Sequence, residues 1–372
     1  MRAIPDMTVQ RRAQSRGMSL VELLVTSAIG IIASLAIFQV FAVFEGQKRT
    51  TTSGGEAQTS GTLALYTIER DLRQGGYGFN TPDLVGCTLQ GWDQNAGAAL
   101  APSTLVPAFI TQGAGSTPGV AGAPDSIVVA YGNDDALPAP VSVLVGSLVV
   151  ADDFIKTVNA LYGFQPGDHV VIAETGKPCT LAQVNQIPPA TGDNTRLNLQ
   201  AGSYVSPYTG ATLNTRYNNP AGLGTAYTAN GKVYNIGPTP TLKVFSVQGG
   251  QLVSQALGAA AATPIFDNIV QLQVQYGKDT NSDGVVDVYN ETTPASTAEW
   301  AAVLAMRIAV VARSSLYEKD EVSPATIRLW EDSVNPPTTT GPVWTLTADE
   351  RHYRYKVFQT VVPLRNMLWR PY

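Results

Sequence analysis

Short oxygen-bearing side chains recur at every second position in one stretch of the C-terminal third of the chain. Oxygen ligands at alternate positions, followed by a glycine that permits a tight turn, can wrap around a hard cation such as Ca2+. The candidate ligands are the side chains of Asp279, Asn281, Asp283 and Asp287 and the backbone carbonyl of Val285. The stretch therefore predicts a calcium site, and the alternative is a polar turn between two strands that binds no metal.

The twelfth position of this stretch departs from the pattern of a full calcium loop. Asn290 stands there in place of a bidentate glutamate, and Glu291 follows one residue later. Because a bidentate carboxylate supplies two of the usual ligands, we expect a weaker site or one that other residues complete. Ca2+ is the only cofactor that the sequence suggests.

Residue patterns for enzymatic chemistry are sparse. The chain has two histidines, His169 and His352, and a single histidine beside strand residues is most often structural. The sequence contains no Gly-x-Ser-x-Gly elbow, no Gly-x-x-x-x-Gly-Lys phosphate loop and no His-Glu-x-x-His zinc helix. We therefore expect a protein that is not an enzyme.

An uncharged apolar run at residues 23–44 dominates the N-terminal region. As a helix of 22 residues it would extend roughly 33 Å, which is enough to cross a bilayer. Arginines precede the run, which predicts that the N-terminus stays in the cytoplasm and that the remainder is exported. Glu22 stands at the edge of the run, where a carboxylate costs free energy unless it has a partner.

The segment Gly17-Met-Ser-Leu-Val-Glu22 resembles the class III signal of type IV prepilins and pseudopilins. The resemblance implies that prepilin peptidase cuts between Gly17 and Met18 and methylates the new amine of Met18. It also implies that Glu22 pairs with the amine of a neighbouring subunit, which offsets part of the desolvation of both charges. Met18 departs from the phenylalanine that is usual after the cut. The alternatives are an uncleaved anchor and an ordinary signal peptide, whose apolar core is shorter and precedes the cut.

Composition favours a β-rich exported domain. The 372 residues are only 14% charged and include 34 glycines and 24 prolines, which favours strands and loops over a helical bundle. The net charge of −5 is unsuited to nucleic acid, whose binding depends on lysines and arginines, so we expect no such partner. Cys87 and Cys179 are predicted to form one disulfide, worth about 4 kcal/mol, in the exported compartment. Two buried free thiols are the alternative.

A long helix is predicted to follow the proposed cut after Gly17. Proline is absent between Asp6 and Thr81, so nothing forbids a helical stem over residues 18–76. Three glycines mark points at which this helix could bend or break: Gly54, Gly55 and Gly61. Its last turns are amphipathic, with Leu65, Ile68 and Leu72 at helical spacing and with Glu69 and Arg73 placed for an ion pair. Gly75 and Gly76 would then end the helix.

Strand patterns dominate the remainder of the chain. Short β-branched runs predict strands at residues 126–131, 142–150 and 169–172. Alternation predicts a half-buried strand over residues 269–276, and longer runs predict a central strand over 300–315 and a final one over 353–365. We interpret residues 95–124, 202–238 and 333–342 as loops, with 202–238 as a mobile surface loop.

Several further motifs make the chain similar to PilW-type minor pilins of type IV pili. They are Arg-Asp-Leu-Arg-Gln-Gly-Gly-Tyr-Gly at 70–78, Gly-Asp-x-Val-Val-Ile at 167–172, the acidic stretch at 276–284 with the tryptophan and strand that follow it, and Leu-Arg-Asn at 364–366. The resemblance implies a pilin-like α+β fold: a long N-terminal helix packed on a β-rich antiparallel domain. It divides the chain into a leader at 1–17, a stem at 18–76 with a transmembrane part at 23–44, and a globular domain at 77–372.

The resemblance also implies a structural role in starting or capping a type IV pilus. The expected partners are the major pilin, other minor pilins, prepilin peptidase, the inner-membrane assembly platform and the membrane itself. The protein would first sit in the inner membrane with its C-terminal domain in the periplasm, and later in the pilus at the cell surface. Two alternatives remain: a minor pseudopilin of a type II secretion system, and a binding module that acts as an adhesin at the filament tip.

Overall fold

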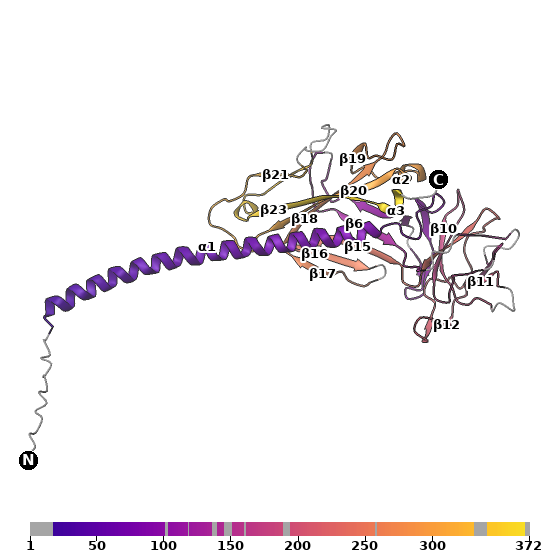
Figure 1. Cartoon of the computed structure of the whole chain (residues 1–372), viewed down its shortest axis with the longest axis horizontal. Coiled ribbons are helices and arrows are strands. Elements are labelled where there is room, and N and C mark those ends of the chain that lie inside the picture. The colour runs from indigo at the N-terminus through magenta and orange to yellow at the C-terminus, as the bar shows by residue number, and fades with distance from the viewer. Residues whose placement is uncertain are drawn as a thin grey trace, which may run out of the picture. The chain divides into compact units, whose positions relative to one another are not determined.

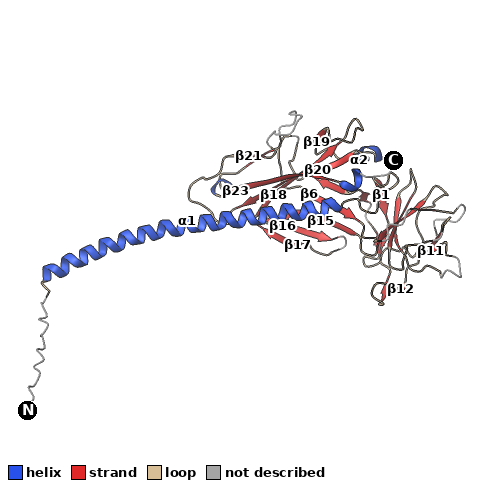
Figure 2. Cartoon of the chain, viewed as in Figure 1, coloured by secondary structure: helices blue, strands red, loops and turns tan. Residues whose placement is uncertain are grey.

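The computed structural model describes residues 18–100, 103–117, 119–135, 140–144, 151–159, 161–188, 194–256, 259–330 and 341–368. The predicted leader and Gly17 therefore lie outside the described residues. The chain forms two compact units, Met1–Ser53 and Gly54–Tyr372. The predicted fold class is confirmed, because one long N-terminal helix precedes an antiparallel β-rich unit (Figures 1 and 2).

Helix α1 (Leu20–Gln74) contributes to both units. It is continuous through Gly54, Gly55 and Gly61, the points at which the sequence allowed a bend. A glycine inside a helix costs only about 1 kcal/mol, and at Gly61 packing explains the residue. A Cβ built there would lie 2.1 Å from a ring carbon of Phe358, so only glycine admits this close approach.

The part of α1 that belongs to the second unit buries one stripe of small and apolar side chains. Ala57, Ala64, Ile68 and Leu72 recur at helical spacing and are fully buried in the largest hydrophobic core. The predicted ion pair between Glu69 and Arg73 is present on the helix. The helix ends as predicted, because the amide of Gly75 bonds to the carbonyl of Leu72 and Gly76 has a φ of +80°.

The strands of the second unit form three larger sheets. The six-stranded sheet has the order β4 (Ser103–Leu105), β1 (Cys87–Gln90), β10 (Cys179–Gln183), β9 (His169–Ala173), β14 (Lys232–Gly237), β7 (Val141–Ser142). The five-stranded sheet has the order β17 (Thr263–Asp267), β16 (Gln251–Ala256), β15 (Thr241–Gln248), β6 (Ser126–Tyr131), β5 (Ala108–Thr111). The four-stranded sheet has the order β19 (Val288–Asn290), β18 (Ile269–Lys278), β20 (Val303–Arg313), β23 (Tyr355–Pro363).

Smaller elements complete the described part of the chain. The two-stranded pairs are β2 (Trp92–Asp93) with β3 (Ala98–Ala99), β8 (Phe154–Lys156) with β11 (Arg196–Asn198), β12 (Ser203–Val205) with β13 (Thr212–Asn214), and β21 (Thr326–Arg328) with β22 (Val343–Thr345). The short helices are α2 (Thr297–Ala301), the 3-10 turn η1 (Glu350–His352) and α3 (Arg365–Leu368). All pairings between these named strands are antiparallel except that of β1 with β10.

Helix α1, the five-stranded sheet and the four-stranded sheet share one hydrophobic core. In Figure 1 the helix runs beside strands β15, β16 and β18, and the buried residues of those elements belong to the same cluster. The six-stranded sheet has separate clusters on its two faces, since consecutive residues of β9 alternate between them. The second unit therefore contains a stem-bearing part and a part built on the six-stranded sheet.

Strand β18 corrects the prediction of a half-buried strand. Its glutamines alternate with apolar residues as predicted, yet Gln271, Gln273 and Gln275 are buried as well. They remain satisfied because Gln271 donates to the carbonyl of Gly122 at 2.9 Å and the other two have comparable partners. Alternation signals one apolar face, but it cannot reveal that loops cover the other face.

Two further boundaries differ from the predicted ones. Trp300 lies in the short helix α2, which Ser296 caps, and the strand that we predicted from residue 300 begins at Val303. The prediction of a surface loop at residues 202–238 is wrong, because this segment contains β12, β13 and the buried strand β14. Residues 95–124 likewise contain β3, β4 and β5. The strands in these two segments are short and lie between glycines and asparagines, so the sequence shows too little alternation to predict them.

Candidate functional site

The first half of α1 exposes its apolar side chains. From Leu20 to Phe44 the large apolar residues are between 51% and 78% exposed, so nothing within the described chain covers them. Among the described residues, α1 is the one helix that is long and apolar enough to span a membrane. Such a continuous apolar surface on a helix requires either lipid or neighbouring protein around it.

Glu22 lies in the first turn of α1, where Ser19 caps the helix. The Oγ of Ser19 accepts a hydrogen bond from the backbone N–H of Glu22 at 3.1 Å, as in the first half of a capping box. The Glu22 carboxylate therefore sits where the partial positive charge of the helix end favours an anion. No side chain among the described residues pairs with this carboxylate, and Met18 is exposed beside it.

The predicted calcium ligands lie in the turn between β18 and β19. Asp279 accepts backbone hydrogen bonds from Ser282 at 2.6 Å and Gly284 at 2.8 Å, and Asp287 accepts one from Thr280 at 2.7 Å. The turn is therefore held by hydrogen bonds between its own residues. The alternative, a polar turn that binds no metal, requires the same bonds.

The side chains of Asp283 and Asp287 both lie within reach of the Asn281 amide, at 3.1 Å and 3.5 Å. Among the described residues, no group of three or more His, Cys, Asp or Glu side chains is placed to hold a metal ion. The Asn281 amide nitrogen donates to the Asp283 carboxylate at 3.1 Å, and its oxygen accepts from the Asp283 backbone N–H at 2.9 Å. The carbonyl of Val285 completes the predicted set, and calcium binding here stays a prediction that a titration must test.

Cys87 and Cys179 form the predicted disulfide, with their Cα atoms 6.0 Å apart. The bond links β1 to β10, the two strands that pair in parallel within the six-stranded sheet. It closes a sequence separation of 92 residues, so its function is to hold the first strand of this sheet onto a much later one.

Two motifs that are far apart in the sequence meet at the end of the stem. The side-chain amide of Asn366 donates to the carbonyl oxygens of Gln74 at 3.1 Å and Gly75 at 3.0 Å. Asn80 in turn donates to the carbonyl of Asn366 at 2.8 Å. These bonds add to the one that the amide of Tyr77 makes with the Gln74 carbonyl at 3.0 Å, and they supply partners to carbonyls at the helix end. The Leu-Arg-Asn motif thus caps the stem.

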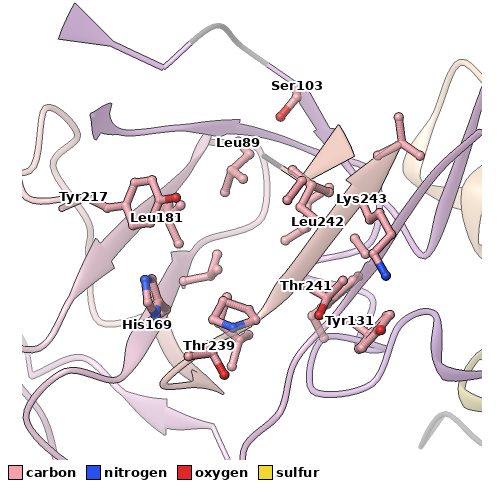
Figure 3. A pocket seen from close by; sticks show the side chains of 18 of the residues that line it. Leu89, Ser103, Tyr131, His169, Leu181, Tyr217, Thr239, Thr241, Leu242 and Lys243 are labelled. Atoms are coloured by element: carbon pink, nitrogen blue, oxygen red, sulfur yellow. The ribbon is translucent and has the colours of Figure 1, made fainter. Parts of the chain in front are cut away.

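A cavity of about 500 Å³ lies between the six-stranded and five-stranded sheets (Figure 3). Its walls are mainly apolar. The wall residues include Leu89, Val171 and Leu181 from the six-stranded sheet and Val128, Ala130 and Leu242 from the five-stranded sheet. Clefts of 300–1,000 Å³ with apolar walls and a few polar groups are typical binding sites.

Polar groups stand at opposite sides of this cavity in Figure 3. His169 and Tyr217 lie at one side, with their rings 5.3 Å apart. Tyr131, Thr241 and Lys243 lie at the other side. The cavity therefore has an apolar middle and two chemically different ends.

His169 lies in the cavity wall, and the structural role that the sequence favours for it stays a prediction. Its Nδ1 lies 3.2 Å from the carbonyl oxygen of Gly237. Burial lowers the pKa of the His169 imidazole to about 4, so the ring is neutral at pH 7. His352 stacks on Tyr317, with ring centroids 4.6 Å apart, and its Nδ1 lies 2.8 Å from the carbonyl of Glu318.

The sequence did not reveal the cavity. Its lining comes from strands whose residues look like ordinary core positions, and Tyr217 lies in the segment that we interpreted as a surface loop. The concentration of tyrosines near residues 204–234 was the one available signal. Which of those tyrosines turn inward depends on how distant strands pack.

A long helix with an exposed apolar half and an antiparallel β-rich unit defines a pilin-like α+β protein. A comparison with protein-family models finds one match over part of the chain. The model for PilW, described as type IV pilus-assembly protein W, matches residues 227–366. This match confirms the predicted resemblance and supports a PilW-type type IV pilus protein. Comparisons with curated proteins and with solved structures give no match.

The matched segment contains most strands of two of the larger sheets. It contains β15 to β20, β23 and the capping residue Asn366, and therefore the five-stranded and four-stranded sheets apart from β5 and β6. The stem helix and most strands of the six-stranded sheet lie outside it. The match thus covers much, though not all, of the core on which the later part of α1 packs, because β5 and β6 also contribute to it.

Proposed function

We propose that the chain is a minor pilin that takes part in starting or capping a type IV pilus. The observation that carries this proposal is the exposed apolar half of α1, with Met18 and Glu22 at its beginning. The PilW match supports a role in type IV pilus assembly. It thereby favours a pilus over the type II secretion alternative, although the two classes of protein share this kind of stem.

In this proposal prepilin peptidase cuts after Gly17 and methylates the amine of Met18. The apolar half of α1 first spans the inner membrane, with the β-rich unit in the periplasm, and then packs among the stems of the major pilin and other minor pilins. The assembly platform in the inner membrane would drive that transfer. Leaving lipid costs the stem little, because neighbouring apolar stems replace lipid at its surface.

Glu22 would set the register of the stem within the filament. Residue 22 lies four positions after the new N-terminus, which is roughly 6 Å along a helix. A neighbouring stem shifted by about that distance would place its amine level with the Glu22 carboxylate. Pairing offsets the cost of holding two separate charges in an apolar environment. A stem in the wrong register would lack this compensation.

The test compares Glu22→Gln with Glu45→Gln in cells. Both variants remove one exposed carboxylate from the same helix, but Glu45 lies beyond the apolar half. We expect Glu22→Gln to lower the number of pili strongly at unchanged membrane insertion, and Glu45→Gln to leave it unchanged. Normal piliation in the Glu22→Gln strain would contradict the proposal.

Two further measurements separate the steps of the proposal. Gly17→Ala should block processing, which retains a leader of roughly 2 kDa on the purified chain. Deletion of the gene should remove pili while secretion of type II substrates continues; the reverse result would favour the pseudopilin alternative. Purification from membranes should recover other minor pilins together with the chain.

A further inference from the structure

The cavity between the six-stranded and five-stranded sheets is too large to be a packing defect. Protein interiors contain few voids larger than one water molecule, and water occupies about 30 Å³ in the liquid. A volume of about 500 Å³ therefore corresponds to roughly 17 groups of that size. A site of this volume with apolar walls suits a chain-like apolar molecule.

One end of the cavity carries a surplus of positive charge. The Nζ of Lys243 lies 2.8 Å from a carboxylate oxygen of Asp71, whose side chain is only 1% exposed. Arg70 binds the other oxygen of the same carboxylate at 3.0 Å. Two cations thus share one anion, and of these three residues Lys243 is the one that lines the cavity.

The opposite end has no such surplus. Arg216 pairs with Asp93 through two hydrogen bonds, of 3.1 Å and 2.8 Å. His169 is a neutral imidazole there, and Tyr217 offers a neutral hydroxyl. The two ends therefore differ in charge, and an anionic group is favoured only beside Lys243.

We infer that the cavity binds a fatty acid, with its aliphatic chain along the apolar walls and its carboxylate at the Lys243 end. The chain would contact Val171 and Leu181 on one wall and Val128 and Ala130 on the other. The volume admits a chain of roughly twelve carbons. This inference does not depend on the pilus role, since much of the cavity lies outside the segment that matches PilW.

Photolabelling of the full chain in lipid nanodiscs tests the inference. The probe is dodecanoic acid with a diazirine at the end of its chain, and labelled peptides are identified by mass spectrometry. We expect label on peptides that contain Val171 or Leu181, and an excess of dodecanoic acid should lower it at least five-fold. The same excess of dodecan-1-ol or dodecylamine should lower it less than two-fold. Stem peptides label from the bilayer and serve as the internal reference.

Two variants and one control separate charge from volume. Lys243→Gln removes the cation and should lower cavity labelling at least three-fold. Lys232→Gln is the matched control, because it breaks a lysine–aspartate pair, with Asp83, outside the cavity, and it should label like the wild type. Since Lys243 also binds the stem, Val128→Trp provides a second variant that fills the cavity and should abolish labelling there. Both variants are first checked for a cooperative thermal transition.

Three outcomes would overturn the inference. The first is label confined to stem peptides, which would mean that the cavity takes up no acyl chain. The second is equal competition by the alcohol or the amine, which would exclude selection of a carboxylate. The third is unchanged cavity labelling in both Lys243→Gln and Val128→Trp, which would place the label at another site.

Discussion

The side-chain amide nitrogen of Asn366 lies 3.0 Å from the carbonyl oxygen of Gly75, a residue 291 positions earlier in the chain. The same amide also donates to the carbonyl of Gln74. The last strand of the four-stranded sheet ends just before Asn366, so this contact joins the stem to the C-terminal end of that sheet. The end of α1 is thereby held to the C-terminal end of the four-stranded sheet.

Asn366→Ala should destabilise the second unit by roughly 1–3 kcal/mol. The substitution removes two hydrogen bonds and leaves two helix-end carbonyls with fewer partners, at about 0.5–1.5 kcal/mol each. All five tryptophans lie after residue 54, so tryptophan fluorescence during urea unfolding of the purified chain reports this unit. Asn230→Ala, at an exposed turn position, is the control. Equal stability of both variants would contradict the capping role.

Gly61→Ala should destabilise the docking of the stem, because the new Cβ would overlap the Phe358 ring. Overpacking of this kind costs about 1–3 kcal/mol. Gly55→Ala on the same helix has open space around it and should stabilise slightly. In a Phe358→Ala background, Gly61→Ala should cost much less unfolding free energy than in the wild type. If the effects of the two substitutions simply add in the double variant, the contact between residues 61 and 358 is not the cause of the destabilisation.

Removal of the disulfide should cost about 4–5 kcal/mol, the chain-entropy value for a loop of this length. We expect the double variant Cys87→Ser and Cys179→Ser to unfold at lower urea than the wild type. A reducing agent should shift the wild type toward the variant and leave the variant itself unchanged. If the urea midpoint of the double variant equals that of the wild type, the pairing of β1 with β10 needs no covalent support.

The stability of the second unit should respond to pH through Asp125 and His169, with opposite signs. Burial raises the pKa of Asp125 to about 6. Hydrogen bonds from the backbone N–H groups of Gly113 and Val274 oppose this rise, and the charge of Glu291 adds a small increase to the same pKa. The folded chain thus binds this proton more tightly than the unfolded chain, so the contribution is present below about pH 4 and is lost as pH rises through 6. The depressed pKa of His169 acts in reverse: its contribution is present above about pH 6.5 and is lost as pH falls toward 4.

Variants at the two sites should therefore change the pH profile in opposite directions. Relative to the wild type, Asp125→Asn should make stability rise more steeply between pH 4 and 6, because the opposing Asp125 contribution is gone. His169→Gln should make it rise less steeply. The measurement is the urea midpoint at half-unit pH intervals. Parallel profiles for all three chains would contradict the assigned protonation states.

Calcium at millimolar concentration should raise the unfolding temperature of the chain modestly, as expected for a weak site. Asp283→Asn should abolish the shift, and Asp320→Asn, an exposed aspartate outside the turn, should retain it. Magnesium at the same concentration is the ionic control. No shift with calcium would leave the turn as a purely hydrogen-bonded one.

Local patterns were enough to predict the elements whose signals are long and periodic. A run of 22 uncharged residues and an amphipathic continuation predicted α1, and its end at Gly75 and Gly76 followed from the conformations that glycine allows. The strand at Ser126–Tyr131 was predicted at its observed bounds, because a short β-branched run between turn residues favours a strand of that length. The predicted processing site is also a local motif, and it stays a prediction.

Only the tertiary structure decided which surfaces these elements share. It buried both faces of β18, turned residues 232–237 into a central strand, and brought Asn366 onto the stem. The cavity depends in the same way on how two sheets lie against each other. Contacts between residues tens to hundreds of positions apart are set by packing, and packing leaves no period in the sequence.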